Sequence, residues 1–411
     1  MLDYSLFPAV TVTAKGEKML RGGHVWVYAD EVVRMTAVPE DGSFVRVEST
    51  SGRFLGTGFY NGHSKIRVRI VSKNLNDTLD EPFWRRRLSW AVRYRRDVLS
   101  DADFDCCRLV FGEADQFPGL TVDRYHNVLV LEVLSKGMAD RRDLLVRLLL
   151  DVLRNEFGQT IDTVYERSDS PLRALEGLPP ACGYLPGEGL FTEGPGTTGI
   201  VENGIRYIVD FVNGQKTGFF LDQKYNRLSV RPLAKDKRVL DACTHTGSFA
   251  LNAAAGGARS VTALDVSEDA LAMAKRHAEL NGFADRISFV RADVFEYLDS
   301  CLKTRETPFD FIILDPPAFT KSRDTLKNAM KGYLEINEKA MRLLPRGGYL
   351  ATCSCSHFMT ETYFKQMLHN AAAETNRQLR QIEARKQSPD HPILWNVPET
   401  DYLKFFLFQV F

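Results

Sequence analysis

The chain has 411 residues, of which 44% are hydrophobic and 26% charged, a composition typical of a globular protein with two or three domains. Its formal net charge is zero, so any contact with nucleic acid must come from locally basic surface. No apolar run approaches the length of a membrane span, and the seven cysteines lack the spacing of a disulfide framework or a zinc site. The composition therefore excludes a disulfide scaffold and predicts a cytoplasmic protein with no membrane partner and no bound metal.

Residues 1–75 are predicted to form a small β-barrel. Four segments separated by glycine-containing turns are the candidate strands: residues 9–13, 43–48, 54–60 and 66–71. Lysines and arginines alternate there with aromatic residues, a mixture that suits RNA binding through phosphate contacts and base stacking. The same composition suits a solvated barrel surface over an aromatic core, and the sequence leaves both interpretations open.

Residues 80–190 are predicted to form a separate, small α+β domain. A helix over residues 83–99 carries six arginines, which fit either a solvated helix face or a face that contacts phosphates. We further expect a strand at residues 127–134, a helix at 139–157, a strand at 163–166 and a connecting loop at 168–195.

Residues 200–411 are predicted to form a Rossmann-like α/β domain in which strands and helices alternate. The expected strands are residues 239–242, 260–264, 287–291, 309–314 and 349–353, and the expected helices are residues 248–255, 268–281, 325–344 and 361–370. Two terminal strands, near residues 379–384 and 403–411, complete the pattern. This order predicts a doubly wound parallel sheet with an antiparallel hairpin at one edge.

A candidate ligand site lies in the first βαβ unit of this third region. A short apolar strand leads through a turn with Gly247 into an alanine-rich helix, and the next strand ends at Asp265. Gly247 lets the backbone approach a ligand at the helix N-terminus. Asp265, about 20 residues further on, is placed to accept hydrogen bonds from a ribose diol. The spacing favours a nucleoside-type cofactor, and the alternative is an ordinary α/β turn with a solvated aspartate.

Two further aspartates follow predicted strands. Asp293 either faces an adenine amino group or simply caps the end of its strand. Asp315 is followed by Pro316 and Pro317, which stiffen the backbone and remove two hydrogen-bond donors. We therefore expect Asp315 to have a functional role at the carboxyl edge of the sheet.

Cys355 follows the next strand and is a candidate nucleophile. Because neighbouring parallel strands end at the same edge of a sheet, we expect Asp315 and Cys355 to lie close together. A thiol there, near the N-terminus of the following helix, can be partly ionised and nucleophilic. Cys353 is expected to lie in the strand as a small hydrophobic residue. Alternation places both cysteines on the same side, so their spacing alone does not separate them.

Seven stretches of the sequence, taken together, carry a family resemblance. They are IRVRIVS (66–72), GEADQFPGLTVDRY (112–125), KTGFFLDQKYNR (216–227), LDACTHTGSFALNAAAGGA (240–258), LDPPAFTKSR (314–323), SCSHFMT (354–360) and DHPILWNVPETDYLK (390–404). The chain resembles, over nearly its whole length, the class I S-adenosylmethionine-dependent rRNA methyltransferases of the large-subunit methyltransferase I type. These proteins make 5-methylcytosine. The resemblance implies a PUA-like RNA-binding barrel, a middle α+β domain and a Rossmann-like methyltransferase domain.

The resemblance also implies a cofactor, a partner and a set of site residues. The cofactor is S-adenosylmethionine, the partner is large-subunit ribosomal RNA, and a homodimer is left open. The residues that it places at the cofactor are Thr217, Gly218, Phe219, Leu221, Gln223, Asp241, Thr244, Thr246, Gly247, Asp265, Val266, Asp293 and Asp315. Asp315 would also serve the reaction centre, and Cys355 would be the nucleophile. This sequence has His357 where the family commonly has glycine, and Cys353 is additional.

The implied chemistry explains why the reaction needs a cysteine. Carbon 5 of cytosine is a poor nucleophile, and thiolate attack at carbon 6 makes it reactive toward a methyl donor. Asp315, close to N3 and the exocyclic amine, would stabilise the charge on the ring. We assign no residue as the base that removes the carbon 5 proton. The alternatives are a guanine-directed RNA methyltransferase, which needs no thiol, and a non-catalytic rRNA-binding or assembly protein.

Overall fold

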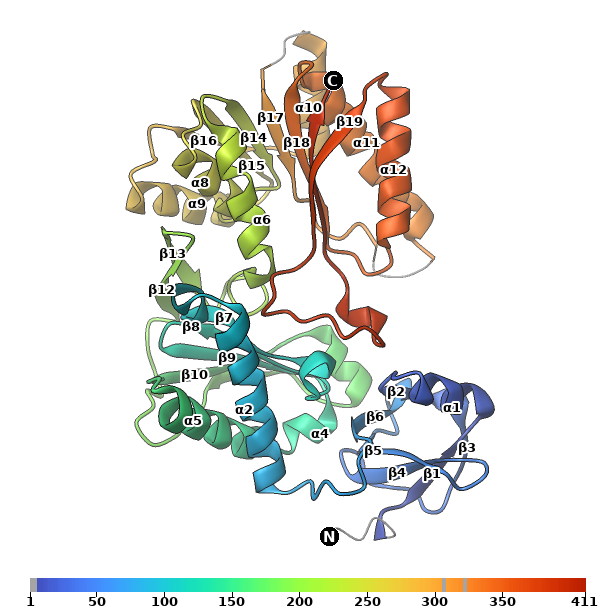
Figure 1. Cartoon of the computed structure of the whole chain (residues 1–411). Coiled ribbons are helices and arrows are strands. Elements are labelled where there is room, and N and C mark those ends of the chain that lie inside the picture. Colours follow the sequence, from blue (N-terminus) through green and yellow to red (C-terminus); the bar gives the residue numbers. More distant parts are fainter. Residues whose placement is uncertain (1–5, 305–307, 321–323) are drawn as a thin grey trace. The chain divides into compact units, whose positions relative to one another are not determined.

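The computed structural model describes residues 6–304, 308–320 and 324–411 (Figure 1). The chain forms two compact units. The first comprises Met1–Ile200, Val209–Leu221 and Pro389–Thr400, and the second comprises Val201–Ile208, Asp222–Ser388 and Asp401–Phe411. Within the described residues, no helix combines the length and apolar character needed to cross a membrane.

A six-stranded sheet occupies the N-terminal part of the first unit. Its strands are β1 (Ala9–Val12), β2 (Trp26–Tyr28), β3 (Val32–Met35), β4 (Phe44–Ser49), β5 (Phe54–Tyr60) and β6 (Ile66–Ser72), in the order β2-β6-β5-β4-β1-β3. Valines from these strands form a common core with Leu55, Tyr60 and Ile70. The four strands expected from the sequence are present. The short strands β2 and β3 were not predicted. The helix α1 (Ala14–Arg21) was not predicted either, because Gly16 inside it weakens the helical pattern.

Part of the basic and aromatic surface of this sheet is bound within the first unit. The indole nitrogen of Trp26 donates to Glu113 over 2.9 Å, and Arg69 forms ion pairs with Glu113 at 3.1 Å and Glu176 at 2.9 Å. Arg69 also lies over the Trp26 ring, 5.6 Å from its centroid. These side chains therefore join the six-stranded sheet to the rest of the unit.

A five-stranded sheet with two long helices forms the remainder of the first unit. The strands are β7 (Cys106–Phe111), β8 (Leu120–Tyr125), β9 (Val128–Val133), β10 (Thr163–Ser168) and β11 (Ala181–Tyr184), in the order β11-β10-β9-β8-β7. The helices α2 (Glu81–Val98) and α5 (Arg142–Phe157) pack against each other, as Figure 1 shows. The segment expected to be a connecting loop contains the edge strand β11, which pairs with β10.

The six arginines of α2 all contact other parts of the first unit. Four of them form ion pairs: Arg85 with Asp151 and Glu156, Arg86 with Asp77, Arg95 with Asp115 and Arg96 with Asp101. Arg87 donates to the carbonyls of Val71 and Gln116. Arg93 lies over the ring of Phe157. Arg87 and Arg95 are buried. These contacts support a structural role for the arginines rather than a phosphate-binding face.

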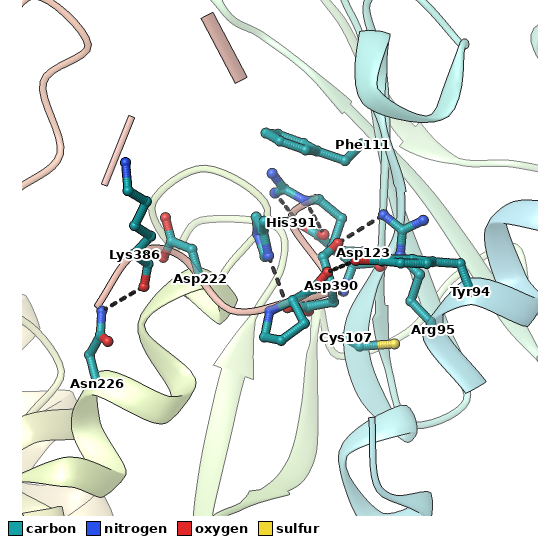
Figure 2. A network of polar contacts seen from close by, with 12 residues as sticks. Tyr94, Arg95, Cys107, Phe111, Asp123, Asp222, Asn226, Lys386, Asp390 and His391 are labelled. Carbon is teal, nitrogen blue, oxygen red and sulfur yellow. Dashed lines mark hydrogen bonds and ion pairs between the residues drawn. The ribbon is translucent and has the colours of Figure 1, made fainter. Parts of the chain in front are cut away.

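A segment close to the C-terminus, Pro389–Thr400, belongs to the first unit (Figure 2). The buried Asp390 accepts a hydrogen bond from the backbone N–H of Arg108 over 2.9 Å, and its carbonyl accepts one from Arg95 over 2.8 Å. The ring of His391 lies 5.4 Å from that of Phe111. The stretch 390–404 singled out in the sequence therefore begins in one unit and ends in the other.

The second unit contains a seven-stranded sheet in the order β16-β15-β14-β17-β18-β20-β19. Its parallel strands are β14 (Arg238–Ala242), β15 (Ser260–Asp265), β16 (Ile287–Arg291), β17 (Phe311–Leu314) and β18 (Gly348–Ser354). The antiparallel strands β19 (Leu379–Arg385) and β20 (Lys404–Val410) complete one edge. The doubly wound sheet with a terminal antiparallel hairpin is thus confirmed.

Two short helices precede the first parallel strand of this sheet, and one longer helix follows each parallel strand. They are α6 (Lys224–Ser229), α7 (Arg231–Ala234), α8 (Ser248–Ala255), α9 (Glu268–Leu280), α10 (Val294–Thr304), α11 (Leu326–Leu343) and α12 (Glu361–Glu374). Side chains of α10, α11 and α12 share one core with the sheet, which includes Leu298, Ile336 and Leu368. Helix α10 was not predicted. Separately, β12 (Thr197–Glu202) and β13 (Ile205–Asp210) form a two-stranded sheet.

Candidate cofactor site and reaction centre

The loop between β14 and α8 has an unusual backbone. Cys243, His245 and Gly247 have φ angles of +64°, +51° and +83°. A non-glycine residue in this region costs about 1–3 kcal/mol, so the loop must be held by its surroundings. The N–H of Thr244 donates to the carbonyl of Leu264 over 2.8 Å, and that of Gly247 donates to Thr244 over 2.9 Å. A strained loop directly after a parallel strand is where an open α/β sheet binds its ligand.

Gly247 is required at the start of α8 for a second reason. A Cβ on this residue would lie 3.0 Å from the Cβ of Ala274 in α9. The loop therefore packs closely against α9, and a side chain at this position would force the loop or the helix to shift.

His277 in α9 contacts the same loop, a role that no motif in the sequence indicates. Its ring is buried, with Nδ1 2.9 Å from the carbonyl of Thr246 and Nε2 accepting from the N–H of Ile208 over 3.0 Å. Nε2 also lies 3.1 Å from the carbonyl of Ile208. The N–H of Ile208 can donate to Nε2 only in the neutral tautomer that carries its proton on Nδ1. Burial lowers the pKa of His277, which favours that neutral form.

Asp241, at the end of β14, has one carboxylate oxygen with partners and one without. Its Oδ2 accepts from the hydroxyl of Thr244 over 2.5 Å and from the N–H of Ala250 over 2.8 Å. Its Oδ1 is buried and makes no hydrogen bond to any described residue. Burial raises the pKa of Asp241 to about 7, although the two hydrogen bonds oppose this shift. An unpaired carboxylate oxygen beside this loop suits a ligand that carries an ammonium group.

Asp265 is the last residue of β15 and hydrogen-bonds to the loop between β14 and α8. Its Oδ2 accepts from the N–H of His245 over 2.8 Å, and its Oδ1 accepts from Ser267 over 3.0 Å. Each oxygen keeps a lone pair, so the partly exposed carboxylate can accept further hydrogen bonds from a diol. The next residue, Val266, is 61% exposed and offers an apolar surface at the same strand end.

Asp293 caps a helix. Its Oδ1 accepts from the N–H groups of Phe295 and Glu296 over 2.8 and 3.2 Å, at the start of α10. The sequence interpretation of Asp293 as the end of a strand did not include this helix cap. Its Oδ2 makes no hydrogen bond to a described residue, so an additional contact to a ligand stays a prediction.

Asp315 follows β17 and is held by Gln223. The Gln223 Nε2 lies 3.1 Å from each oxygen of the Asp315 carboxylate. Asn226 donates to Gln223 Oε1 over 2.6 Å and thereby fixes which end of the amide faces Asp315. Asn226 also donates to the carbonyl of Lys386, a contact drawn in Figure 2. Burial, followed by the charge of Asp222, raises the pKa of Asp315 to about 7.

The two cysteines of β18 and its end differ in their surroundings. Leu314 of β17 pairs in register with Thr352 of β18. The residues that follow them, Asp315 and Cys353, therefore lie at the same level of the two adjacent strands. The Cys353 thiol is fully buried, and burial, followed by the charge of Asp315, keeps its pKa well above the usual range. Cys355 lies just beyond the strand and is only partly buried. Of the two, Cys355 is therefore the more accessible thiol.

Tyr333 lies at the same end of the sheet, and charges on Asp315 and Cys355 both affect its pKa. The hydroxyl of Tyr333 in α11 accepts from Ser354 over 3.1 Å, and its pKa is raised by burial and, to a smaller extent, by the charges of Cys355 and Asp315. Tyr333 is therefore tied by a hydrogen bond to the residue that precedes Cys355. Lys321, Ser322 and Arg323, which end the LDPPAFTKSR stretch, are outside the described residues.

Thr217, Gly218, Phe219 and Leu221 belong to the first compact unit. The hydroxyl of Thr217 donates to Asp123 over 2.5 Å and lies 3.0 Å from that of Tyr125. Gly218 has φ +122°, and a Cβ there would lie 2.7 Å from Val209. These contacts explain the local conformation of the stretch, and its predicted role at the cofactor stays a prediction.

The sheet and its glycine loop define an S-adenosylmethionine-dependent methyltransferase. Residues 172–409 match the family described as S-adenosylmethionine-dependent methyltransferase, and residues 10–73 match the PUA-like domain. The chain belongs to this methyltransferase family, together with the proteins named Ribosomal RNA large subunit methyltransferase I. That of Klebsiella pneumoniae (strain 342) is 37% identical over 407 residues, 99% of each chain. That of Cronobacter sakazakii is 38% identical over 401 residues, 97% of this chain and 98% of the other.

Solved structures show the same fold. A putative S-adenosylmethionine-dependent methyltransferase from Streptococcus mutans superposes with a TM-score of 0.81 at 24% identity, covering 98% of this chain and 99% of the other. A putative methyltransferase complexed with SAH superposes with a TM-score of 0.82 at 23% identity and the same coverage. The predicted PUA-like and Rossmann-like architecture and the predicted cofactor are thus confirmed.

The described residues fit S-adenosylmethionine. The orphaned Oδ1 of Asp241 can accept from the ammonium group of its methionine part, and the Asp265 carboxylate can accept from its ribose diol. When bound, this cofactor supplies an electrophilic methyl group on a sulfonium.

Proposed function

We propose that the protein methylates carbon 5 of a cytosine in large-subunit ribosomal RNA. Two observations support the proposal. The first is the name of the relatives, which are 37% and 38% identical over nearly the whole chain. The second, which carries the cytosine assignment, is the placing of a carboxyl and an accessible thiol after the paired strands β17 and β18.

Cys355 would act as the nucleophile. Its thiolate adds to carbon 6 of the cytosine, forming a carbon–sulfur bond and raising the electron density at carbon 5. Once carbon 5 has been methylated, loss of its proton allows the carbon–sulfur bond to break and returns the thiolate. The target base must leave any stack to reach these groups.

Asp315 would hold the pyrimidine. Because burial raises its pKa to about 7, a large fraction of the carboxyl is protonated at neutral pH. The protonated form can donate to N3 of cytosine while its second oxygen accepts from the exocyclic amine. Gln223, fixed by Asn226, would keep the carboxyl in this orientation.

The decisive experiment is covalent trapping. Ribosomal RNA that contains 5-fluorocytosine cannot lose a proton from carbon 5, so the adduct should accumulate on the protein in the presence of S-adenosylmethionine. We expect the adduct to be lost in Cys355→Ala and kept in Cys353→Ala, because Cys353 is buried and protonated.

The identity of the modified nucleoside gives an independent test. Nucleoside mass spectrometry of unmodified rRNA after reaction should show 5-methylcytosine. A methylated guanine that forms equally well with Cys355→Ala would contradict the proposal, as would RNA binding with no methyl transfer.

A further inference from the structure

Lys404 is a buried lysine at the end of the sheet that carries Cys355. It is the first residue of β20, pairs in register with Ser354 of β18, and is only 3% exposed. It is also the last residue of the stretch 390–404, to which the proposed function gives no role. A buried ammonium group is costly unless something nearby compensates it.

Backbone carbonyls hold this ammonium group. Its Nζ donates to the carbonyl of Ser356 over 2.5 Å and to that of Tyr402 over 2.8 Å. Ser356 directly follows Cys355, so the lysine is tied to the turn that presents the thiol. Within residues 308–320 and 324–411, no carboxylate forms an ion pair with Lys404, and two carbonyls leave one of its three N–H donors for another acceptor.

The nearby acidic groups are already paired. Lys386 lies 2.5 Å from Asp401 and 3.2 Å from Glu361, and Glu361 also pairs with Lys365 over 2.6 Å. Lys386 and Lys365 partly offset these two carboxylates, so Asp401 and Glu361 raise the pKa of Lys404 less than a negative charge on Cys355 does.

The electrostatic interaction between Lys404 and Cys355 affects the ionisation of both side chains. Burial lowers the pKa of Lys404 to about 8, and a negative charge on Cys355 is the largest effect that opposes this shift. Because such an interaction is mutual, the Lys404 ammonium must favour the Cys355 thiolate to the same extent.

Other titratable groups near Cys355 do not supply this charge. The Tyr333 hydroxyl and the Cys353 thiol both have a pKa raised by burial, so they stay neutral near pH 7. Asp315, when ionised, is negative and disfavours a thiolate. Lys404 is the cation that donates directly to the turn that follows Cys355.

We propose that Lys404 is the positioning residue that holds Cys355 as a thiolate ready to attack the pyrimidine. The inference rests on the proposed role of Cys355, and its chemistry is that of any thiolate stabilised by a neighbouring cation. Lys404 touches neither the base nor the cofactor in this scheme.

The test measures the thiol directly, without RNA or cofactor. The protein is treated with iodoacetamide between pH 6 and 10, and peptide mass spectrometry follows the alkylation of Cys355. The exposed Cys182, in the first unit, serves as internal reference. We expect Cys355 of the unaltered protein to titrate below the value of about 8.5 for a free thiol.

Two variants separate charge from packing. Lys404→Met removes the charge and should slow Cys355 alkylation at pH 7.5 about tenfold, the effect of a pKa rise of about one unit. Lys404→Arg keeps the charge and should restore most of the rate, with Cys182 unchanged in both.

A Cys355 titration at or above about 8.5 in the unaltered protein would overturn the inference, even if the variants failed to fold. Equal slowing by methionine and arginine, with intact circular dichroism, would also overturn it, because a structural role alone would give that result. The readout is thiol reactivity, so a negative result here is distinct from failure to form 5-methylcytosine.

Discussion

Replacing Gly247 with alanine tests the loop that we assign to the cofactor. The new Cβ would lie 3.0 Å from Ala274 Cβ, at a φ angle of +83°. Left-handed backbone costs an alanine about 1–2 kcal/mol, and overpacking adds about 1–3 kcal/mol. We therefore expect Gly247→Ala to lower the free energy of unfolding by about 2–5 kcal/mol. Because α9 is packed against the sheet, the loop should shift, and S-adenosylhomocysteine should bind at least about tenfold more weakly, equal to about 1.4 kcal/mol.

Gly257 provides the matched control. It has a similar φ of +85°, but the nearest atom to a Cβ there is 3.8 Å away. Gly257→Ala should therefore lose only the backbone contribution of about 1–2 kcal/mol and keep its affinity for S-adenosylhomocysteine. Urea unfolding and isothermal titration calorimetry measure both quantities. If Gly247→Ala bound the ligand like the unaltered protein, or lost no more stability than Gly257→Ala, the assignment of this loop would be wrong.

Two further substitutions address the same unit. His277→Phe removes the ring nitrogens that contact the carbonyl of Thr246 and the N–H of Ile208. We therefore expect the free energy of unfolding in urea to fall by about 2–4 kcal/mol and S-adenosylhomocysteine to bind more weakly. Unchanged binding would show that the ring does not hold the loop in place. The third prediction concerns pH. Asp315 has a pKa raised from 3.8 to about 7 in the folded state, so folding takes up a proton and the free energy of unfolding should fall as pH rises from 3.8 to about 7. Asp315→Asn cannot titrate, and its unfolding free energy should fall less over the same range; equal slopes in the two proteins would contradict the raised pKa.

Much of the second unit follows from the sequence because its signals are local. Phe311–Leu314 is a continuous apolar run, as expected for a strand buried on both faces, and every residue in it is buried. Helix α10 was missed although its signals were present. Asp293 is its cap, and Phe295, Leu298 and Leu302 recur at helical spacing on its core side. Asp293 had been interpreted only as the end of a strand or as a ligand group, and that interpretation hid the helix start.

The residues that the sequence did not reveal act through contacts between distant positions. His277 joins Thr246 to Ile208, Asn226 orients Gln223 toward Asp315, and Lys404 reaches the carbonyl of Ser356. Asn226 and Lys404 stand in stretches that carry the family resemblance, but the spacing within those stretches does not indicate what either residue contacts. Their functions depend on which strands become neighbours, and that information is present only in the folded sheet.

The crossing of the chain between its two compact units has a consequence for synthesis on the ribosome. The first unit is completed by Pro389–Thr400, whose Asp390 receives hydrogen bonds from Arg95 and from the backbone of Arg108. A nascent polypeptide released from the exit tunnel only as far as residue 200 lacks that aspartate, and the buried Arg95 guanidinium then lacks one of its acceptors. The first unit therefore cannot finish folding before translation is nearly over, and a gene cut at residue 200 should yield an N-terminal fragment that is less stable than the same unit in the whole chain.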